Sequence, residues 1–174
     1  MPDYRQHLGS LRSLKADKHR VAFFDLDRTL IAVYSAIPLL MEQVKARQVS
    51  WIGAAQQVFM ALGQSRQVYD FEEVLDTAIG MLQGVSEAEF SRMGDRLFHK
   101  HLQKKLYAEA QELVDTHRQL GHHLVIVSSA TRYQIESVAE ALGVDTILCT
   151  ELEVRGGEFT GVVKGAPCWA EGKR

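Results

Sequence analysis

The stretch "VAFFDLDRTL", residues 21–30, sets four apolar residues directly before two aspartates. The apolar run predicts a short strand over Val21–Phe24 that is buried on both faces. Asp25 and Asp27 follow with one residue between them, so their side chains turn toward the same side. Two carboxylates this close repel each other when both are ionised, which favours a bound cation or a shared proton. Mg²⁺ suits such a pair because it prefers oxygen ligands and also binds phosphate oxygens.

The rest of the chain predicts an α/β fold. Residues 36–105 show helical periodicity throughout, which indicates a helical insertion. Buried strands are expected at 124–127 and 145–150, with helices before and between them. The alternation predicts a Rossmann-like, doubly wound parallel sheet with helices on both faces. Gly156 and Gly157 separate two further strand-like runs, as in a β-hairpin near the C-terminus.

Two helix starts carry the sequence pattern of a capping box. Ser86 is followed three residues later by Glu89, and Thr131 by Gln134. In this motif the side chains at the two positions satisfy backbone N–H groups at the helix start. We therefore expect a helix to begin near each pair.

Composition and charge limit the classes of partner. The 174 residues are 46% hydrophobic and 24% charged, with a formal net charge of −2. This balance predicts neither a nucleic-acid nor a membrane partner. Residues 1–19 contain no signal-peptide-like apolar segment and are expected to be a frayed N-terminal extension of a cytoplasmic protein. Cys149 and Cys168 are too few for a disulfide framework and are interpreted as reduced packing residues.

Polar residues end two of the predicted strands. The first strand leads into Asp25, and the strand at 124–127 leads into Ser128 and Ser129. Ligands of open α/β sheets bind at the carboxyl ends of the strands, where a following helix start near Thr131 would also attract an anion. The sequence therefore predicts an anion site at this edge of the sheet.

Three motifs resemble those of the haloacid dehalogenase-like hydrolases, a superfamily dominated by phosphatases. "DLDRTL" resembles the first motif, DxDxT, and "LVIVSSAT" resembles the second. "EVRGGEFTGVVKGAPCWAEGKR" resembles the hairpin and third motif of the phosphoserine phosphatase-like subfamily IB. The resemblance implies a core of residues 20–35 and 106–174, with a helical cap at 36–105.

The resemblance also implies a role for each motif residue in hydrolysing a small-molecule phosphomonoester with Mg²⁺. Asp25 would attack phosphorus, become an aspartyl-phosphate and bind the metal. Asp27 would act as acid and base and bind the metal through its backbone carbonyl. Ser128 would donate a hydrogen bond to the phosphoryl oxygens, and Lys173 would neutralise charge. The remaining residues expected at the phosphate or substrate are Arg28, Thr29 and Ser129.

The pattern departs from the family at two places. Phosphoserine phosphatases carry a Glu about nine positions after the nucleophile, where this chain has Tyr34, and this argues against phosphoserine as substrate. The sequence also stops at Arg174, before the fourth, acidic motif, and this predicts a truncated core with an unfinished sheet edge.

Three functional alternatives stay open at this stage. The first is an active Mg²⁺-dependent phosphatase, and the second is a weak or inactive relative that binds a phosphorylated ligand or a partner. A receiver-type signalling domain is the third, but Asp27, Thr29 and the large helical insertion fit it poorly. Association of two copies through the cap or the unfinished sheet edge is a further open alternative.

Overall fold

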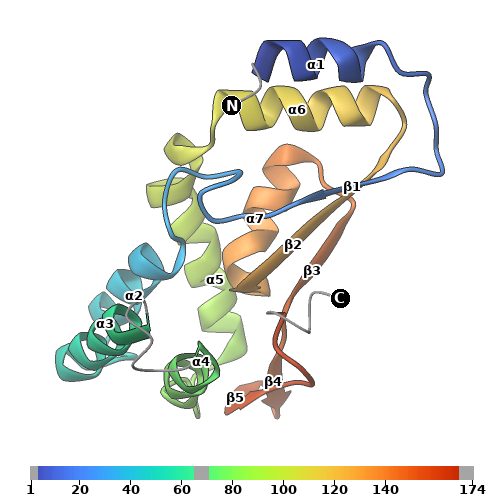
Figure 1. Cartoon of the computed structure of the whole chain (residues 1–174). Coiled ribbons are helices and arrows are strands. Elements are labelled where there is room, and N and C mark those ends of the chain that lie inside the picture. The colour runs from blue at the N-terminus through green and yellow to red at the C-terminus, as the bar shows by residue number, and fades with distance from the viewer. Residues whose placement is uncertain (1–3, 65–70, 169–174) are drawn as a thin grey trace.

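A three-stranded parallel sheet forms the centre of the computed structural model, which describes residues 4–64 and 71–168 (Figure 1). Its strands are β1 (Val21–Phe24), β2 (His123–Thr131) and β3 (Thr146–Thr150), in the order β1-β2-β3. Parallel pairing places Phe24 beside Ile126 and Val127 beside Leu148. The parallel sheet with its helices confirms the predicted α/β fold class.

Helices supply the connections between these strands. α7 (Arg132–Leu142) links β2 to β3 and ends at Gly143, which has the left-handed backbone typical of a helix C-terminus. The chain between β1 and β2 is helical apart from turns in its described part. Its elements are α2 (Ala36–Lys45), α3 (Trp51–Gln64), α4 (Phe71–Gly80), α5 (Glu87–Leu97), η1 (Phe98–Leu102), η2 (Gln103–Lys105) and α6 (Ala108–Gln119).

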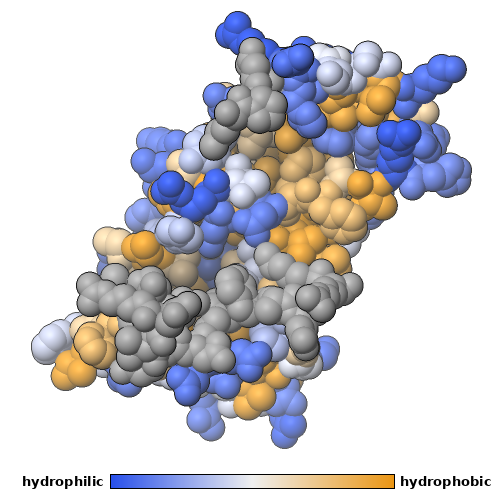
Figure 2. Space-filling model, in the orientation of Figure 1, coloured by the Kyte–Doolittle hydropathy of each residue, from blue (hydrophilic) through white to orange (hydrophobic). Residues whose placement is uncertain are grey.

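One face of the sheet is buried and the other is largely open among the described residues. Ala22 and Phe24 are buried, whereas Val21 and Phe23 are 47% and 64% exposed. The prediction that this strand is buried on both faces is therefore wrong. Both crossovers advance in the same direction along the sheet, so right-handed connections put α6 and α7 on the same face, whereas the alternation of strands and helices predicted helices on both faces. Figure 2 shows apolar residues gathered over the open face, where Leu148 of β3 is also exposed.

The N-terminal segment is ordered rather than frayed where the structure describes it. Helix α1 (Tyr4–Arg12) lies along α6 (Figure 1) and buries Leu8. The Tyr4 hydroxyl donates to the Glu109 carbonyl at 2.8 Å, and Arg12 pairs with Glu112 at 2.9 Å. These contacts hold the helix against α6.

The predicted hairpin is confirmed. Strands β4 (Leu152–Arg155) and β5 (Glu158–Val163) pair antiparallel across Gly156 and Gly157. Both glycines have positive φ, 61° and 83°, which two-residue hairpin loops of this kind require. The Glu87 N–H donates to the Gly157 carbonyl at 2.9 Å, so the hairpin is fastened to the start of α5.

One of the two predicted capping boxes forms. Thr131 caps α7, and the Thr131 N–H donates to the Gln134 side chain at 3.0 Å. Ser86 lies at the start of α5 but makes no side-chain capping bond, so the box predicted with Glu89 is wrong. The backbone of Ser86 instead forms a β-bridge to Glu158, and this bridge fixes the entry to the helix.

Candidate functional site

The two aspartates lie in a tight turn at the carboxyl end of β1. Leu26, between them, is fully buried, and its carbonyl accepts the Leu30 N–H at 2.9 Å. Asp25 and Asp27 are half-buried. Arg28 has a φ of 63°, a left-handed conformation that costs a non-glycine residue energy. The buried Leu26 thus anchors a strained turn that presents both carboxylates at the sheet edge.

The carboxyl group of Asp27 is electrostatically distinct from an exposed aspartate. Burial raises its pKa, and the nearby charge of Asp25 raises it further. The Ser35 N–H donates to Asp27 Oδ1 at 2.9 Å, and this bond and a hydrogen bond from the Ser35 side chain oppose that increase in the pKa. Because both burial and the neighbouring charge disfavour ionisation, Asp27 is suited to carry a proton at a higher pH than an ordinary Asp.

A buried polar chain connects Asp27 to the start of α7. Gln134 Nε2 donates to Ser35 Oγ at 2.8 Å, and Gln134 Oε1 accepts from the Thr131 hydroxyl at 2.9 Å. Ser35 is 0% exposed and Gln134 is 6% exposed. The sequence marks Gln134 only through the capping-box pattern and does not mark Ser35, because their contact joins positions 99 residues apart.

The strand that carries Ser128 runs beside β1. Phe24 pairs with Ile126, so Asp25 and Ser128 follow the paired positions toward the same edge. The expectation that the strand ends before Ser128 is wrong, since β2 continues to Thr131 with an irregular register. The extension is held by the Thr150 hydroxyl, which donates to the Ser129 carbonyl at 2.9 Å.

Ser128 itself is buried, with 2% of its surface exposed. Its Oγ accepts the Ala130 N–H at 3.2 Å, so the hydroxyl hydrogen can be directed at another acceptor. The structure thus gives Ser128 a fixed oxygen position and a hydrogen to donate.

The remaining predicted residues differ in their contacts at the site. The Thr29 hydroxyl donates to Asp25 Oδ2 over a long 3.4 Å. Arg28 is exposed and its guanidinium lies 5.9 Å from the centre of the Tyr34 ring. Lys173 lies outside the described residues.

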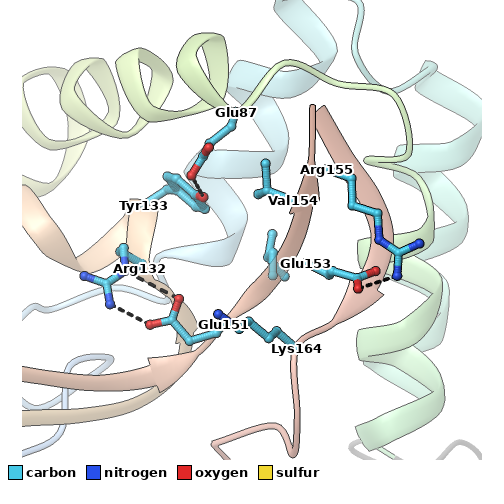
Figure 3. A pocket seen from close by; sticks show the side chains of 9 residues that line it. Glu87, Arg132, Tyr133, Glu151, Glu153, Val154, Arg155 and Lys164 are labelled. Carbon is cyan, nitrogen blue, oxygen red and sulfur yellow. Dashed lines mark hydrogen bonds and ion pairs between the residues drawn. The ribbon is translucent and has the colours of Figure 1, made fainter. Parts of the chain in front are cut away.

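A separate pocket of about 410 Å³ lies between α5, α7 and the hairpin (Figure 3). Arg132 Nη2 pairs with Glu151 Oε1 at 2.6 Å, and the Tyr133 hydroxyl donates to Glu87 at 2.9 Å. The Arg132 pairing lowers the pKa of Glu151. The residues that line the pocket are Glu87, Arg132, Tyr133, Glu151, Leu152, Glu153, Val154, Arg155 and Lys164. Its charges largely bind one another and tie the three elements together.

Other candidate chemistries find little support in the described residues. No three His, Cys, Asp or Glu side chains converge there as a metal-binding group. Burial raises the pKa of the Cys149 thiol to about 12, so this cysteine is a poor nucleophile at neutral pH. None of the described helices is long and apolar enough to cross a membrane.

An acidic turn at the carboxyl edge of a parallel sheet, beside a serine on the next strand, defines an α/β protein with an edge site. A sequence model of the haloacid dehalogenase-like hydrolases matches residues 22–174. The chain therefore belongs to that family.

Individual relatives carry phosphatase names. The chain is 28% identical over 171 residues to a phosphoserine phosphatase from Mycobacterium tuberculosis, covering 95% of this chain and 55% of that protein. It is 29% identical over 157 residues to another M. tuberculosis protein, named as a probable phosphatase, covering 87% and 54%. The chain thus spans about half the length of these curated relatives.

Solved structures share the fold. A Bordetella pertussis protein of unknown function superposes with a TM-score of 0.79 at 24% identity, over 90% of this chain and 71% of that one. A phosphoserine phosphatase, solved as a phospho-aspartyl intermediate analogue, superposes with a TM-score of 0.60 at 20% identity, over 86% and 64%.

Proposed function

We propose that the chain carries the site of a Mg²⁺-dependent phosphatase that hydrolyses a small-molecule phosphomonoester through an aspartyl-phosphate. The observation that carries the proposal is the half-buried carboxyl of Asp27, held by Ser35, one residue beyond Asp25 at the sheet edge. Membership of the hydrolase family and the phosphatase names of its relatives support it.

In the proposed reaction, the Asp25 carboxylate attacks phosphorus and the bond to the leaving alcohol breaks. Asp27 gives its proton to the departing oxygen, and its raised pKa makes that proton available. Asp27 then takes a proton from the water that attacks the aspartyl-phosphate and releases phosphate. Dividing one hydrolysis into two steps lowers each barrier.

The other residues stabilise charge during phosphoryl transfer, which depends mainly on positioning and electrostatics. The Ser128 hydroxyl donates to a phosphoryl oxygen, and Lys173 neutralises negative charge. At the mouth of the site, the phosphate or the substrate is contacted by Thr29, Ser129 and the exposed guanidinium of Arg28.

The donor set at this edge fits Mg²⁺, which needs only one or two carboxylates when waters and phosphate supply its other ligands. Asp25 would hold it through a carboxylate oxygen and Asp27 through its backbone carbonyl. Bound there, the ion offsets charge on the phosphoryl oxygens.

We also propose that residues 36–105 act as a cap over this edge and residues 20–35 with 106–174 as the core. α2 begins one residue after Ser35, which binds Asp27, so the cap starts at the candidate site. Closure of such a segment would exclude water during the transfer step.

The test is phosphate release from p-nitrophenyl phosphate with Mg²⁺, comparing the native chain with Asp25→Asn. We expect at least a ~1,000-fold decrease, since losing a nucleophile in other hydrolases costs up to about a million-fold. Asp145→Asn is the matched control, because it makes the same change at the opposite edge of the sheet and should keep the native rate. Equal rates for the native chain and Asp25→Asn would exclude Asp25 as nucleophile.

A second candidate function is a non-catalytic module that binds a phosphorylated ligand. The observation that favours it is that no third carboxylate joins Asp25 and Asp27 among the described residues. Calorimetric titration with Mg²⁺ and beryllium fluoride separates the two: tight, Mg²⁺-dependent binding supports the enzyme, and its absence at millimolar Mg²⁺ supports the module.

A further inference from the structure

We propose that Gln134 and Ser35 are positioning residues that fix the orientation of the Asp27 carboxyl group. The inference rests on the proposed function, because it assigns the role of these residues to the catalytic step of Asp27. It extends the candidate site to Gln134, which the sequence pattern marks only as a capping residue of α7.

The direction of the Gln134 amide is determined by its neighbours. Oε1 accepts from both the backbone N–H of Thr131, at 3.0 Å, and its hydroxyl, at 2.9 Å. A flipped amide would aim its NH₂ group at the Thr131 N–H, which can only donate. Nε2 is therefore the end that faces Ser35 and donates to its Oγ at 2.8 Å.

The orientation of Ser35 is also determined by its hydrogen bonds. Its Oγ accepts from Gln134, so its own hydrogen points away from that residue. Its backbone N–H donates to Asp27 Oδ1 at 2.9 Å. Because Ser35 is 0% exposed, bulk water cannot replace either bond.

This arrangement couples two strand ends that must act together. Asp27 follows β1, and Thr131 ends β2, the strand that carries Ser128. The polar chain links them through buried, directed bonds, in addition to the pairing of β1 with β2. A reacting carboxyl that is displaced by about 1 Å can lose about 100-fold in rate, so the proposed reaction needs such support.

The decisive variant is Gln134→Glu. Glutamate keeps an oxygen for Thr131 and is itself a capping-box residue, so α7 should still begin correctly. It cannot donate to Ser35, so the bond between positions 35 and 134 must reverse or break. We expect kcat for p-nitrophenyl phosphate to fall at least about tenfold while KM stays within about twofold.

Controls separate this effect from folding and from charge. Gln119→Glu adds the same charge at an exposed position of α6 and should leave kcat unchanged. Ser35→Ala removes both the acceptor of Gln134 and the side-chain hydrogen bond to Asp27 but keeps the backbone N–H, and it should also lower kcat with little change in KM. The double variant should lose no more than the larger single loss, because both changes cut one chain of bonds. Native kcat in both single variants, or losses that multiply in the double variant, would overturn the proposal.

A readout without turnover distinguishes this proposal from the proposed function. The Ser35 amide proton, bonded to a carboxylate, should give a downfield NMR resonance that moves in Gln134→Glu and not in Gln119→Glu. If the native chain hydrolyses no ester, the phosphatase proposal fails, and a displaced Ser35 resonance still supports the coupling. A resonance that is unchanged in Gln134→Glu contradicts it.

Discussion

The two edges of the parallel sheet use their polar groups in opposite ways. At the carboxyl edge, bonds from Thr131 through Gln134 and Ser35 converge on Asp27, a carboxylate that keeps further acceptor capacity. At the amino edge, Asp145 Oδ2 accepts the Leu124 N–H at 2.8 Å and joins the start of β3 to the start of β2.

The polar chain that ends at Asp27 and the bond between Asp145 and Leu124 predict different consequences of substitution. Side chains at the carboxyl edge orient groups that can still bind a ligand, so changing them should affect activity more than stability. Asp145 at the amino edge has a backbone partner, so changing it should affect stability alone.

Among variants that leave both aspartates in place, Ser128→Ala is expected to give the largest effect. Removing one donor to a developing oxyanion typically costs about 100-fold or more in kcat, and the buried Ala130 N–H, left without its acceptor, should cost about 1–3 kcal/mol of unfolding free energy. Phosphate-release kinetics and urea unfolding measure both. Ser137→Ala, where α7 meets α5, removes a hydroxyl that bonds Asp95 at 3.0 Å and should keep native kcat. A stability loss without a kcat loss in Ser128→Ala would contradict the comparison.

Asp145→Ala tests the amino edge. The change leaves the N–H of the buried Leu124 without its carboxylate acceptor, which should cost about 1–3 kcal/mol of unfolding free energy. Urea unfolding measures the loss, and kcat should stay native. Asp145→Asn keeps an acceptor and should recover most of the stability; an equal loss in both variants would show that the bond to Leu124 is not the cause.

Arg28→Gly tests the strained turn at the carboxyl edge. Glycine relieves the left-handed conformation, which should stabilise the fold by about 1–2 kcal/mol. It also raises the conformational entropy of the unfolded chain, which should destabilise the fold by about 0.4–1 kcal/mol. The contact with Tyr34 is lost as well. Stability should therefore change by less than about 1 kcal/mol, while KM for a phosphate ester rises because a positive charge leaves the mouth.

Arg47→Gly provides the matched control for this change. Arg47 also has a positive φ, 57°, but lies in the turn after α2. Its replacement should give a similar small change in unfolding free energy and no change in KM. A comparable increase of KM in both variants would mean that overall charge, rather than the turn at Asp27, controls substrate binding.

The sequence predicted the parts of the site that are local in the chain. Asp25 and Asp27 were found because an apolar run and a short motif mark them, and the strand with Ser128 has the same signature. Ser35 could not be found, because its partner Gln134 is 99 residues away and the contact depends on tertiary packing. The exposure of Phe23 was also missed, because an apolar run alone does not tell burial on one face from burial on two.

Acidic pH should destabilise the fold through His117 and His122 at the amino edge of the sheet. His117 Nδ1 and His122 Nδ1 lie 2.8 Å apart, a hydrogen bond that needs one of them neutral. Burial lowers the pKa of His117, and the charges of His122 and His7 lower it further. Folding thus favours the neutral ring, so its contribution to stability is present above the unfolded pKa of about 6.5 and is lost as the pH falls below it.

Urea unfolding at pH 7.5 and 5.5 should show a loss of unfolding free energy at the lower pH in the native chain and in the exposed-site control His99→Gln, and a smaller loss in His117→Gln. Equal losses in all three would mean that the acid sensitivity arises elsewhere than at this pair.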